Sequence, residues 1–229
     1  MVAETRGINI YAESALHESV KAYLSRAGDR LEALVEGKIV DLVRADGELV
    51  EIQTARLDKL AAKVAFLASS AKVRVVHPIA AEKEIIRLDP TTGEILSTRK
   101  SPKHGTILSL FDELVKASSL LSVPGLTIEV LLVKVRELRT KDGSGSWRRG
   151  GDRTVARELV SVVESRQFSC REDWSALLPR GEVWDSTSLA QALGISSTLA
   201  RKMLYTLSKT GIIEESGKSG RKKMYRLVS

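Results

Sequence analysis

Two alternating runs, Lys38-Ile39-Val40-Asp41-Leu42-Val43-Arg44 and Glu48-Leu49-Val50-Glu51-Ile52-Gln53-Thr54, flank the tripeptide Ala45-Asp46-Gly47. Aliphatic and β-branched residues dominate both runs, and an Asp-Gly pair stands between them, so the segment is typical of a β-hairpin. A two-residue turn at Asp46-Gly47 would pair Asp41 with Ile52 and mix carboxylates with aliphatic side chains on both faces. A one-residue change of register moves every side chain to the other face, so the loop length determines which residues meet.

A three-residue loop with Gly47 in the left-handed conformation separates the carboxylates from the aliphatic side chains better than the two-residue turn does. It pairs Asp41 with Glu51 on one face, which also carries the pairs Val43–Leu49 and Ile39–Gln53. The other face carries Leu42–Val50 and Val40–Ile52, with an Arg44–Glu48 charge pair beside the loop. We expect this register.

Two carboxylates directly opposite each other stand about 4.5–5.5 Å apart at Cβ, and the pair is destabilising unless a cation lies near it. Mg²⁺ or Mn²⁺, which prefer oxygen ligands, would resolve the conflict. A Lys or Arg side chain, or solvent, would also resolve it. Glu13 lies on the apolar face of a helix expected over 10–27 and either adds a third carboxylate or favours the helix N-terminus. We interpret His17, near the same face, as a packing residue.

The surrounding pattern predicts an α/β core, more specifically α+β with a mixed sheet. A helix is expected over 57–69, and a strand over 72–76 that ends at His77-Pro78. A basic loop, Arg99-Lys100-Ser101-Pro102-Lys103, follows a hairpin of residues 83–88 and 94–98. Further expected elements are a helix over 107–121, a strand over 127–138, and a segment over 157–168 that is either its partner strand or a helix.

Composition restricts the class of protein. The 229 residues include one cysteine, Cys170, so an internal disulfide is excluded and a Cys/His zinc cluster is disfavoured. No run approaches a membrane span and residues 1–25 do not resemble a signal peptide, so we expect a cytoplasmic protein with no membrane partner. The formal net charge is +7. Residues 1–135 are balanced in charge, and the excess lies in residues 136–229, as expected for a module that binds nucleic acid.

The C-terminal segment has the layout of a helix-turn-helix followed by a basic hairpin. A helix over 188–193, a turn at Gly194, a helix from Ser197 and strands around residues 212–215 and 224–228 resemble a winged helix. This resemblance implies duplex DNA as the partner, although winged helices also mediate protein contacts. A basic, Gly-rich loop precedes the module. The expected DNA-binding residues are Trp147, Arg148 and Arg149 in the loop, Thr198, Arg201, Lys202 and Tyr205 on the second helix, and Lys218, Arg221, Lys222 and Lys223 in the wing.

The carboxylates, helices and strands of residues 8–80 resemble the PD-(D/E)XK nuclease superfamily, whose fold is restriction-endonuclease-like. The resemblance implies that Asp41 and Glu51 are metal ligands for Mg²⁺ or Mn²⁺, that Glu13 assists them, and that Gln53 occupies the lysine position. Two departures are Val40 in place of proline and Gln53 in place of lysine. An amide can position a water but cannot act as a base, and Lys63 on the following helix is a candidate for the missing ammonium.

These expectations combine into a metal-dependent DNA endonuclease or structure-specific repair nuclease that acts on duplex or branched DNA at the nucleoid. The expected division is a nuclease-like domain over 1–140, a loop over 141–154 and a winged helix over 155–229. A homodimer is compatible with this division. The alternative is a non-catalytic DNA-binding regulator or repair scaffold with a degenerate nuclease-like domain, and Gln53 is the feature that favours it.

Overall fold

The computed structural model describes residues 15–145, 150–181 and 183–228. A helix covers residues 15–24 of the described chain. The strands are β1 (Arg30–Val35), β2 (Lys38–Val43), β3 (Leu49–Ile52), β4 (Val73–Leu88), β5 (Ile95–Lys100), β6 (Leu126–Thr140), β7 (Arg153–Phe168), β8 (Ile213–Ser219) and β9 (Lys222–Leu227). The α-helices are α2 (Ala61–Leu67), α3 (Phe111–Leu114), α4 (Arg171–Ser175), α5 (Ser186–Leu193) and α6 (Ser197–Lys209). Three 3-10 helices, η1 (Leu57–Lys59), η2 (Ile107–Leu110) and η3 (Ser118–Ser122), complete the described elements.

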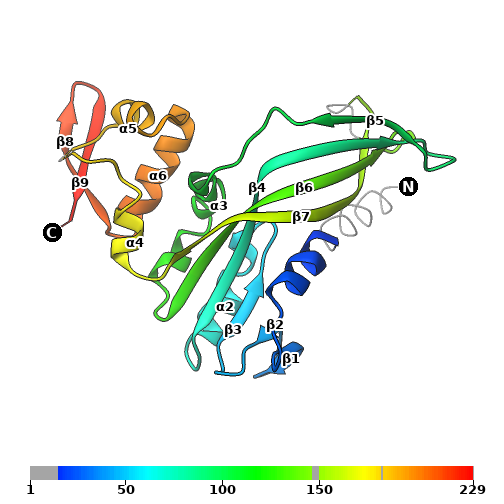
Figure 1. Cartoon of the computed structure of the whole chain (residues 1–229). Coiled ribbons are helices and arrows are strands. Elements are labelled where there is room, and N and C mark those ends of the chain that lie inside the picture. The colour runs from blue at the N-terminus through cyan, green and yellow to red at the C-terminus, as the bar shows by residue number, and fades with distance from the viewer. Residues whose placement is uncertain (1–14, 146–149, 182, 229) are drawn as a thin grey trace.

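Seven strands form one mixed sheet in the order β1-β2-β3-β4-β6-β7, with β5 paired to β4 beyond the end of β3. The pairs β3–β4 and β4–β6 are parallel and the other pairs are antiparallel. Figure 1 shows β4, β6 and β7 as long strands that run side by side, with β5 along one end and the C-terminal helices at the other. The expected class, an α/β protein with a mixed sheet and helices, is therefore confirmed.

The β2–β3 hairpin has the register expected from its side-chain pattern. Leu42 pairs with Val50 and Val43 with Leu49, and Gly47 has a φ of 88° in the three-residue loop. The expected Arg44–Glu48 charge pair is wrong. The Arg44 guanidinium turns inward to Asp29 and the Leu24 carbonyl instead, because it is buried beside the first helix.

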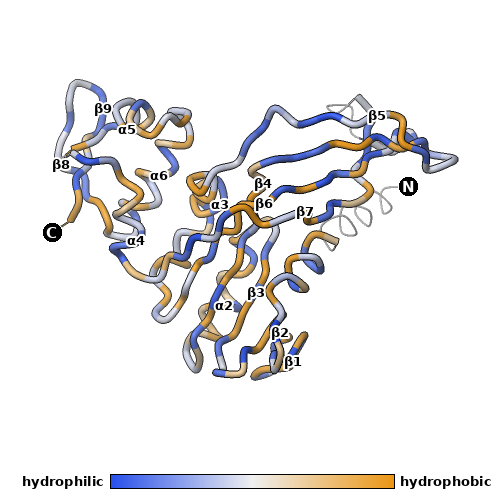
Figure 2. The backbone as a smooth tube through the Cα atoms, in the orientation of Figure 1, coloured by the Kyte–Doolittle hydropathy of each residue, from blue (hydrophilic) through white to orange (hydrophobic). Residues whose placement is uncertain are grey.

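The sheet buries a separate hydrophobic cluster on each face. On one face Val43 and Leu49 pack in the large cluster that includes Leu57 and Val64 of η1 and α2. The other face has a smaller cluster that joins Leu42, Val50 and Ile52 to Leu16, Val20 and Leu24 of the first helix. Figure 2 shows hydrophobic residues concentrated around β3 and α2, and hydrophilic residues along the stretch that leads from β5 toward α3.

The strand expected to end at His77-Pro78 continues to Leu88. Proline lacks the N–H that a central strand donates to its neighbour. Gln53 donates to the Val76 carbonyl on the β3 side of β4, so the Pro78 nitrogen faces the same side one step further along. A donor at position 78 would meet the Gln53 carbonyl, and Nδ1 of His77 contacts that carbonyl at 2.6 Å instead. The proline therefore costs the sheet no hydrogen bond.

Two other expectations about the second half of the chain are corrected. Residues 107–121 do not form one helix but are divided among η2, α3 and η3. Residues 153–168 form β7, which pairs with β6 along its length, so the segment left open between strand and helix is a strand. The sheet therefore extends past the expected boundary at residue 155, and the C-terminal elements begin near residue 169.

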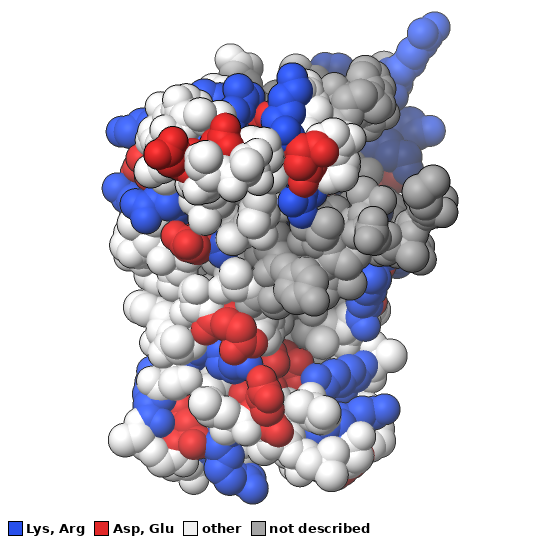
Figure 3. Space-filling view, turned by 90° about the vertical axis from the view of Figure 1, so that its right-hand side faces the viewer, with Lys and Arg blue, Asp and Glu red and all other residues white. Residues whose placement is uncertain are grey.

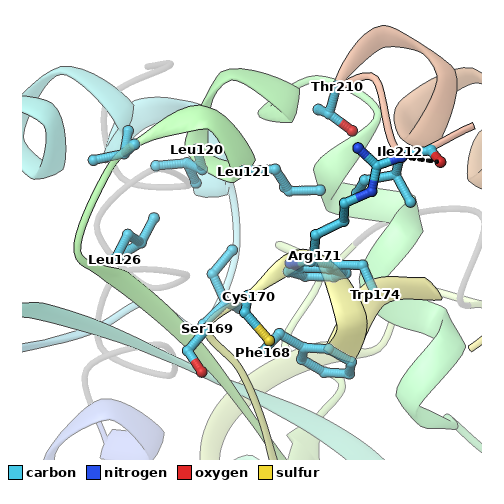
Figure 4. Close-up of a pocket in the computed structure, with 12 residues that line it drawn as sticks. Leu120, Leu121, Leu126, Phe168, Ser169, Cys170, Arg171, Trp174, Thr210 and Ile212 are labelled. Atoms are coloured by element: carbon cyan, nitrogen blue, oxygen red, sulfur yellow. Dashed lines mark hydrogen bonds between the residues drawn. The ribbon is translucent and has the colours of Figure 1, made fainter. Parts of the chain in front are cut away.

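An aromatic junction connects the sheet to the C-terminal elements. The Trp174 ring of α4 stacks on Phe168 at the end of β7, with 4.4 Å between ring centroids, and meets the edge of Phe111 at 6.2 Å. A pocket of about 180 Å³ lies beside Phe168 and Trp174. Figure 4 shows its lining, with the Arg171 side chain reaching the Ile212 carbonyl. One hydrophobic cluster contains residues from both parts of the chain, so they pack as one body.

None of the described helices has both the length and the apolar character that crossing a membrane requires.

A buried carboxylate stabilises the long strands at their distal end. Glu137 on β6 is 1% exposed and pairs with Lys83 at 3.1 Å, Arg139 at 2.6 Å and Arg157 at 3.0 Å. Burial alone would raise the pKa of Glu137, but the three cations outweigh it and lower that pKa from 4.5 to about 2. The folded state therefore holds Glu137 ionised at pH values where the unfolded chain binds a proton.

Glu137→Gln is expected to lower the free energy of unfolding at pH 7 by about 3 kcal/mol, because 2.5 pKa units of stabilisation are lost. The contribution is complete above pH 4.5 and disappears as the pH falls toward 2, so the variant should lose less stability than the parent across that range. Urea unfolding at pH 7 and thermal melts from pH 7 to pH 2.5 measure both effects. Glu158→Gln is the control, because its ion pair with Arg136 is longer, at 3.8 Å, and half exposed. Equal losses in the two variants would contradict the role of Glu137.

Candidate functional site

The Asp41 carboxylate lies where strands β2 and β3 separate. Its Oδ2 atom accepts a 2.7 Å hydrogen bond from the Ile52 N–H. In the observed register Ile52 stands opposite Val40, so a regular ladder would give this N–H to the Val40 carbonyl. The Asp41 side chain therefore replaces a backbone acceptor, and the β2–β3 pairing ends beside it.

The backbone on the other side of β2 is irregular at the same place. Glu32 of β1 stands at the register position opposite Asp41 and has a φ of 48°, which is uncommon for a residue with a side chain. Val40 packs on the α2 face with Val43, although alternation would place it with Leu42. Strained backbone is a frequent feature of functional sites.

Glu51 of β3 and Lys63 of α2 form an ion pair at the separated strand ends. The Lys63 Nζ lies 2.5 Å from Glu51 Oε1 and donates to the Ile39 carbonyl at 2.6 Å. The Glu51 side chain is 4% exposed, and burial raises its pKa although Lys63 opposes the rise. The role of Lys63 as the missing ammonium stays a prediction, and in this geometry its Nζ contacts both β2 and β3.

Gln53 does not use its amide nitrogen toward the carboxylates. That nitrogen donates to the Ala55 carbonyl, which bends the chain as it leaves β3. The Gln53 backbone carbonyl contacts Nδ1 of His77 at 2.6 Å, and burial lowers the pKa of His77, so its imidazole is neutral. The water-orienting role expected for Gln53 stays a prediction, and Lys63 is the residue that contacts Glu51.

His17 is the site residue that the sequence pattern missed. It extends from the first helix and places Nε2 3.1 Å from Asp41 Oδ2. Its hydrogen bond to Asp41 raises the pKa of His17, and burial only partly opposes this. Burial would raise the pKa of Asp41, but the bonds from His17 and Ile52 outweigh it and lower that pKa. The available signal was the place of His17 near the apolar face of the expected helix, and this does not distinguish a packing imidazole from one that contacts a carboxylate.

The pair Asp41 and Glu51 offers oxygen ligands of the kind that Mg²⁺ and Mn²⁺ accept. In the described part of the chain, Asp41 Oδ1 and Glu51 Oε2 have no hydrogen-bond or ion-pair partner, so one oxygen of each carboxylate is available. No group of three or more His, Cys, Asp or Glu suited to a metal occurs among residues 15–145, 150–181 and 183–228. The expected third carboxylate, Glu13, lies outside the described residues. Two protein oxygens fit a magnesium ion that keeps several waters.

The predicted DNA-binding residues of α6 divide into two groups. Thr198, Arg201 and Tyr205 lie on the exposed side, where Arg201 donates to Thr198 Oγ1 at 3.3 Å. Lys202 instead pairs with Asp112 of α3 at 2.6 Å and links α6 to the sheet. Lys202 is therefore engaged within the protein, and the three other residues are presented to solvent.

The wing cations also differ in their partners. Lys222 lies 3.5 Å from Asp185, and Lys223 pairs with Glu215 at 2.7 Å. Across 183–228 and the rest of the described chain, Lys218 and Arg221 have no ion-pair partner. Trp147, Arg148 and Arg149 lie outside the described residues. The positive charge of this region is thus smaller than its count of Lys and Arg indicates.

The side of the molecule on which the first helix lies has no uniform charge. Figure 3 shows acidic and basic side chains interleaved over the lower part of this side, at the height of β1 and β2. Lys21 illustrates the pattern, because it is 7% exposed and pairs with both Glu18 at 2.8 Å and Glu32 at 2.6 Å. The acidic residues near Asp41 are therefore partly neutralised.

Asp41→Asn is expected to lower the pKa of His17, because the carboxylate that raises it is lost while the burial that lowers it stays. The pair stabilises the fold below pH 6.5, and this contribution is lost as the pH rises through the folded pKa of His17. An NMR titration of the imidazole Hε1 signals measures the change. His77 is the internal control and should keep a pKa below 6.5 in both proteins. An unmoved His17 titration would contradict the contact.

Comparisons with other proteins place the chain in a family. The family described as "Domain of unknown function (DUF8091)" matches residues 14–169, which cover the first helix and the whole seven-stranded sheet. An uncharacterized protein of Treponema pallidum (strain Nichols) is 32% identical over 224 residues, which span 96% of this chain and 87% of the relative. No solved structure matches the chain. The matched region covers more than half of the chain and contains both site carboxylates, so the chain belongs to this family, described as a domain of unknown function.

Proposed function

We propose that the protein is a metal-dependent DNA nuclease of the PD-(D/E)XK type, with Asp41 and Glu51 as the metal ligands. The observation that carries the proposal is the separation of β2 and β3 at Asp41, which brings the half-buried Asp41 carboxylate, the buried Glu51 carboxylate and the Lys63 ammonium together. The order of the elements, a helix, three antiparallel strands, α2 and then β4 parallel to β3, agrees with the order on which the sequence resemblance rests. The restriction-endonuclease-like fold is part of this proposal.

The chain's own residues supply binding and orientation at this site. Asp41 Oδ1 and Glu51 Oε2 would hold Mg²⁺ or Mn²⁺, while His17 keeps Asp41 ionised and oriented. A divalent ion bound here would lower the pKa of a bound water and neutralise charge on the phosphate. Lys63, released from Glu51, is placed to donate to a phosphate oxygen. No covalent nucleophile is required, and Gln53 would help to orient the water.

The C-terminal elements would deliver the site to duplex or branched DNA as a winged helix. Helices α5 and α6 are joined at Gly194, which has a φ of 63°, and are followed by the β8–β9 hairpin. The exposed residues Thr198, Arg201 and Tyr205 would contact DNA from α6. In this proposal the protein acts on nucleoid DNA, in repair or a related process.

A second candidate is a DNA-binding scaffold without catalysis. The observation that favours it is the engagement of the site groups within the protein, since Lys63 pairs with Glu51 and the Gln53 amide donates to Ala55. In this case Asp41 and Lys63 would serve only to close the end of the β2–β3 pair.

Asp41→Asn and Glu51→Gln are expected to reduce Mg²⁺-dependent or Mn²⁺-dependent cleavage to the background without enzyme. The amide oxygen introduced by Asp41→Asn still accepts the Ile52 N–H, so the variant should stay folded, as thermal melts would verify. Single-stranded, duplex, flap and four-way DNA form the substrate panel. Glu94→Gln, an exposed carboxylate between β4 and β5 with no ion pair among the described residues, is the control and should cut like the parent. Cleavage by both site variants at the parental rate would refute the assigned site, and DNA binding without cleavage by the parent would favour the scaffold.

Within the wing, Lys218→Gln with Arg221→Gln should weaken DNA binding more than Lys222→Gln with Lys223→Gln, because the second pair is already neutralised by Asp185 and Glu215. The two double variants change the net charge equally. Fluorescence anisotropy at several salt concentrations would show a flatter salt dependence for the first variant, by about one to two units of slope. Equal effects would indicate that the internal ion pairs do not decide which cations meet DNA.

A further inference from the structure

A basic strip follows the end of β5 and continues toward η2. Arg99, Lys100, Lys103 and His104 are all exposed. In the part of the chain that the structure describes, Arg99, Lys100 and Lys103 form no ion pair, unlike Lys202, Lys222 and Lys223 of the C-terminal elements. Three unpaired cations within five residues are the densest free positive charge that the described sequence offers, although they lie in the half of the chain with no net charge.

The strip borders the largest of the described pockets. This pocket has a volume of about 420 Å³ and is lined by Lys100 and His104 on one side and by Lys134 of β6 on another. Lys134 pairs with Glu82 at 2.9 Å, and the pKa of Glu82 is lowered first by that bond. Lys100 and His104 add to the lowering. The second carboxylate of the pocket, Glu84, pairs with Arg136 at 3.2 Å, so Lys100 is left without a carboxylate partner among the described residues.

The charged lining of the pocket lies on the face of the sheet that α2 covers. Along β6, Lys134 alternates with Val133 and Val135, which pack against the first helix, so Lys134 and its partner Glu82 lie on the opposite face. That face also carries Lys63 of α2, the partner of Glu51. Along β4, the distance from Val76, next to the site, to Glu84, in the pocket, is about 25 Å. Figure 3 shows Lys and Arg side chains projecting from the upper part of the side on which the first helix lies, at the height of β5.

We propose that Arg99, Lys100 and Lys103, with the adjoining pocket, bind the phosphate backbone of the DNA flanking the cleaved position. This inference rests on the proposed function. Lys and Arg side chains bind phosphates without reading sequence, and each contact releases counterions. A separation of about 25 Å corresponds to about seven base pairs at about 3.4 Å per pair. The strip is therefore a second contact site, distinct from the wing, that holds the duplex on one side of the cut.

The test compares two triple variants that remove the same charge. Arg99→Gln, Lys100→Gln and Lys103→Gln neutralise the strip. The matched control removes three other exposed lysines that form no ion pair among the described residues, through Lys59→Gln, Lys72→Gln and Lys116→Gln. These lysines lie outside the strip, in η1, before β4 and after α3. Binding to a duplex of about 30 base pairs is measured by fluorescence anisotropy between about 50 and 200 mM salt, with Mg²⁺ replaced by Ca²⁺ to prevent cleavage.

The strip variant should bind about tenfold more weakly than the parent at about 100 mM salt, and its salt slope should fall by about two to three units. The control variant should stay within about twofold. With duplexes that extend fewer than about six base pairs beyond the cut on that side, the difference between strip variant and parent should disappear. Parental affinity and slope in the strip variant would overturn this inference while leaving the nuclease proposal intact. Absence of DNA binding and cleavage by the parent would overturn both.

Discussion

The hydrogen bond from the Ile52 N–H to the Asp41 carboxylate is the contact on which the candidate site depends. In a regular antiparallel pair this donor would belong to a backbone carbonyl, and Asp41 would point away from the sheet. By accepting the N–H, the side chain lets β2 turn away from β3 without leaving a buried donor unpaired, which would cost about 1–3 kcal/mol. The separation makes room for Glu51 and Lys63. Because the Asp41 carboxylate replaces a backbone carbonyl as the acceptor, it both opens the gap between the strands and is itself one of the groups that line the gap.

The remaining charged groups of the sheet follow the same physical constraint. Buried carboxylates are stable only with partners, and the strands supply them from neighbouring positions. Glu129 of β6 is satisfied by Arg74 of β4 at 3.1 Å and by Ser165 of β7 at 2.6 Å, and Glu137 by its three cations. These groups are fully committed within the sheet. Asp41 and Glu51 differ from them because each keeps one oxygen free, which separates a candidate site from structural ion pairs.

The sequence allowed the hairpin register to be predicted because only one loop length places Val43 with Leu49 and keeps the carboxylates together. Lys63 was a candidate ammonium because it lies on the helix that follows β3, but its contact with Glu51 depends on how α2 packs on the sheet. The continuation of β4 through Pro78 was not predictable, because it depends on the His77 side chain, which takes the place of the missing donor at the Gln53 carbonyl. The same limit applies to β7, since its pattern suits a strand or a helix until β6 is available as a partner. His17 was missed because nothing local distinguishes a packing imidazole from one that meets a carboxylate 24 residues away.

The net charge of a segment does not show which of its cations stay unpaired after folding. Counted along the sequence, the positive excess lies entirely after residue 135, which favours the C-terminal helices as the part proposed to bind DNA. In the folded chain, Lys202, Lys222 and Lys223 each lie against a carboxylate, and their fields are largely cancelled at the distance of a Debye length. Arg99, Lys100 and Lys103 have no such partner among the described residues, although their half of the chain is neutral overall. A polyanion responds to the charges that remain unpaired, so the neutral half carries a stronger local attraction than its sum of charges predicts.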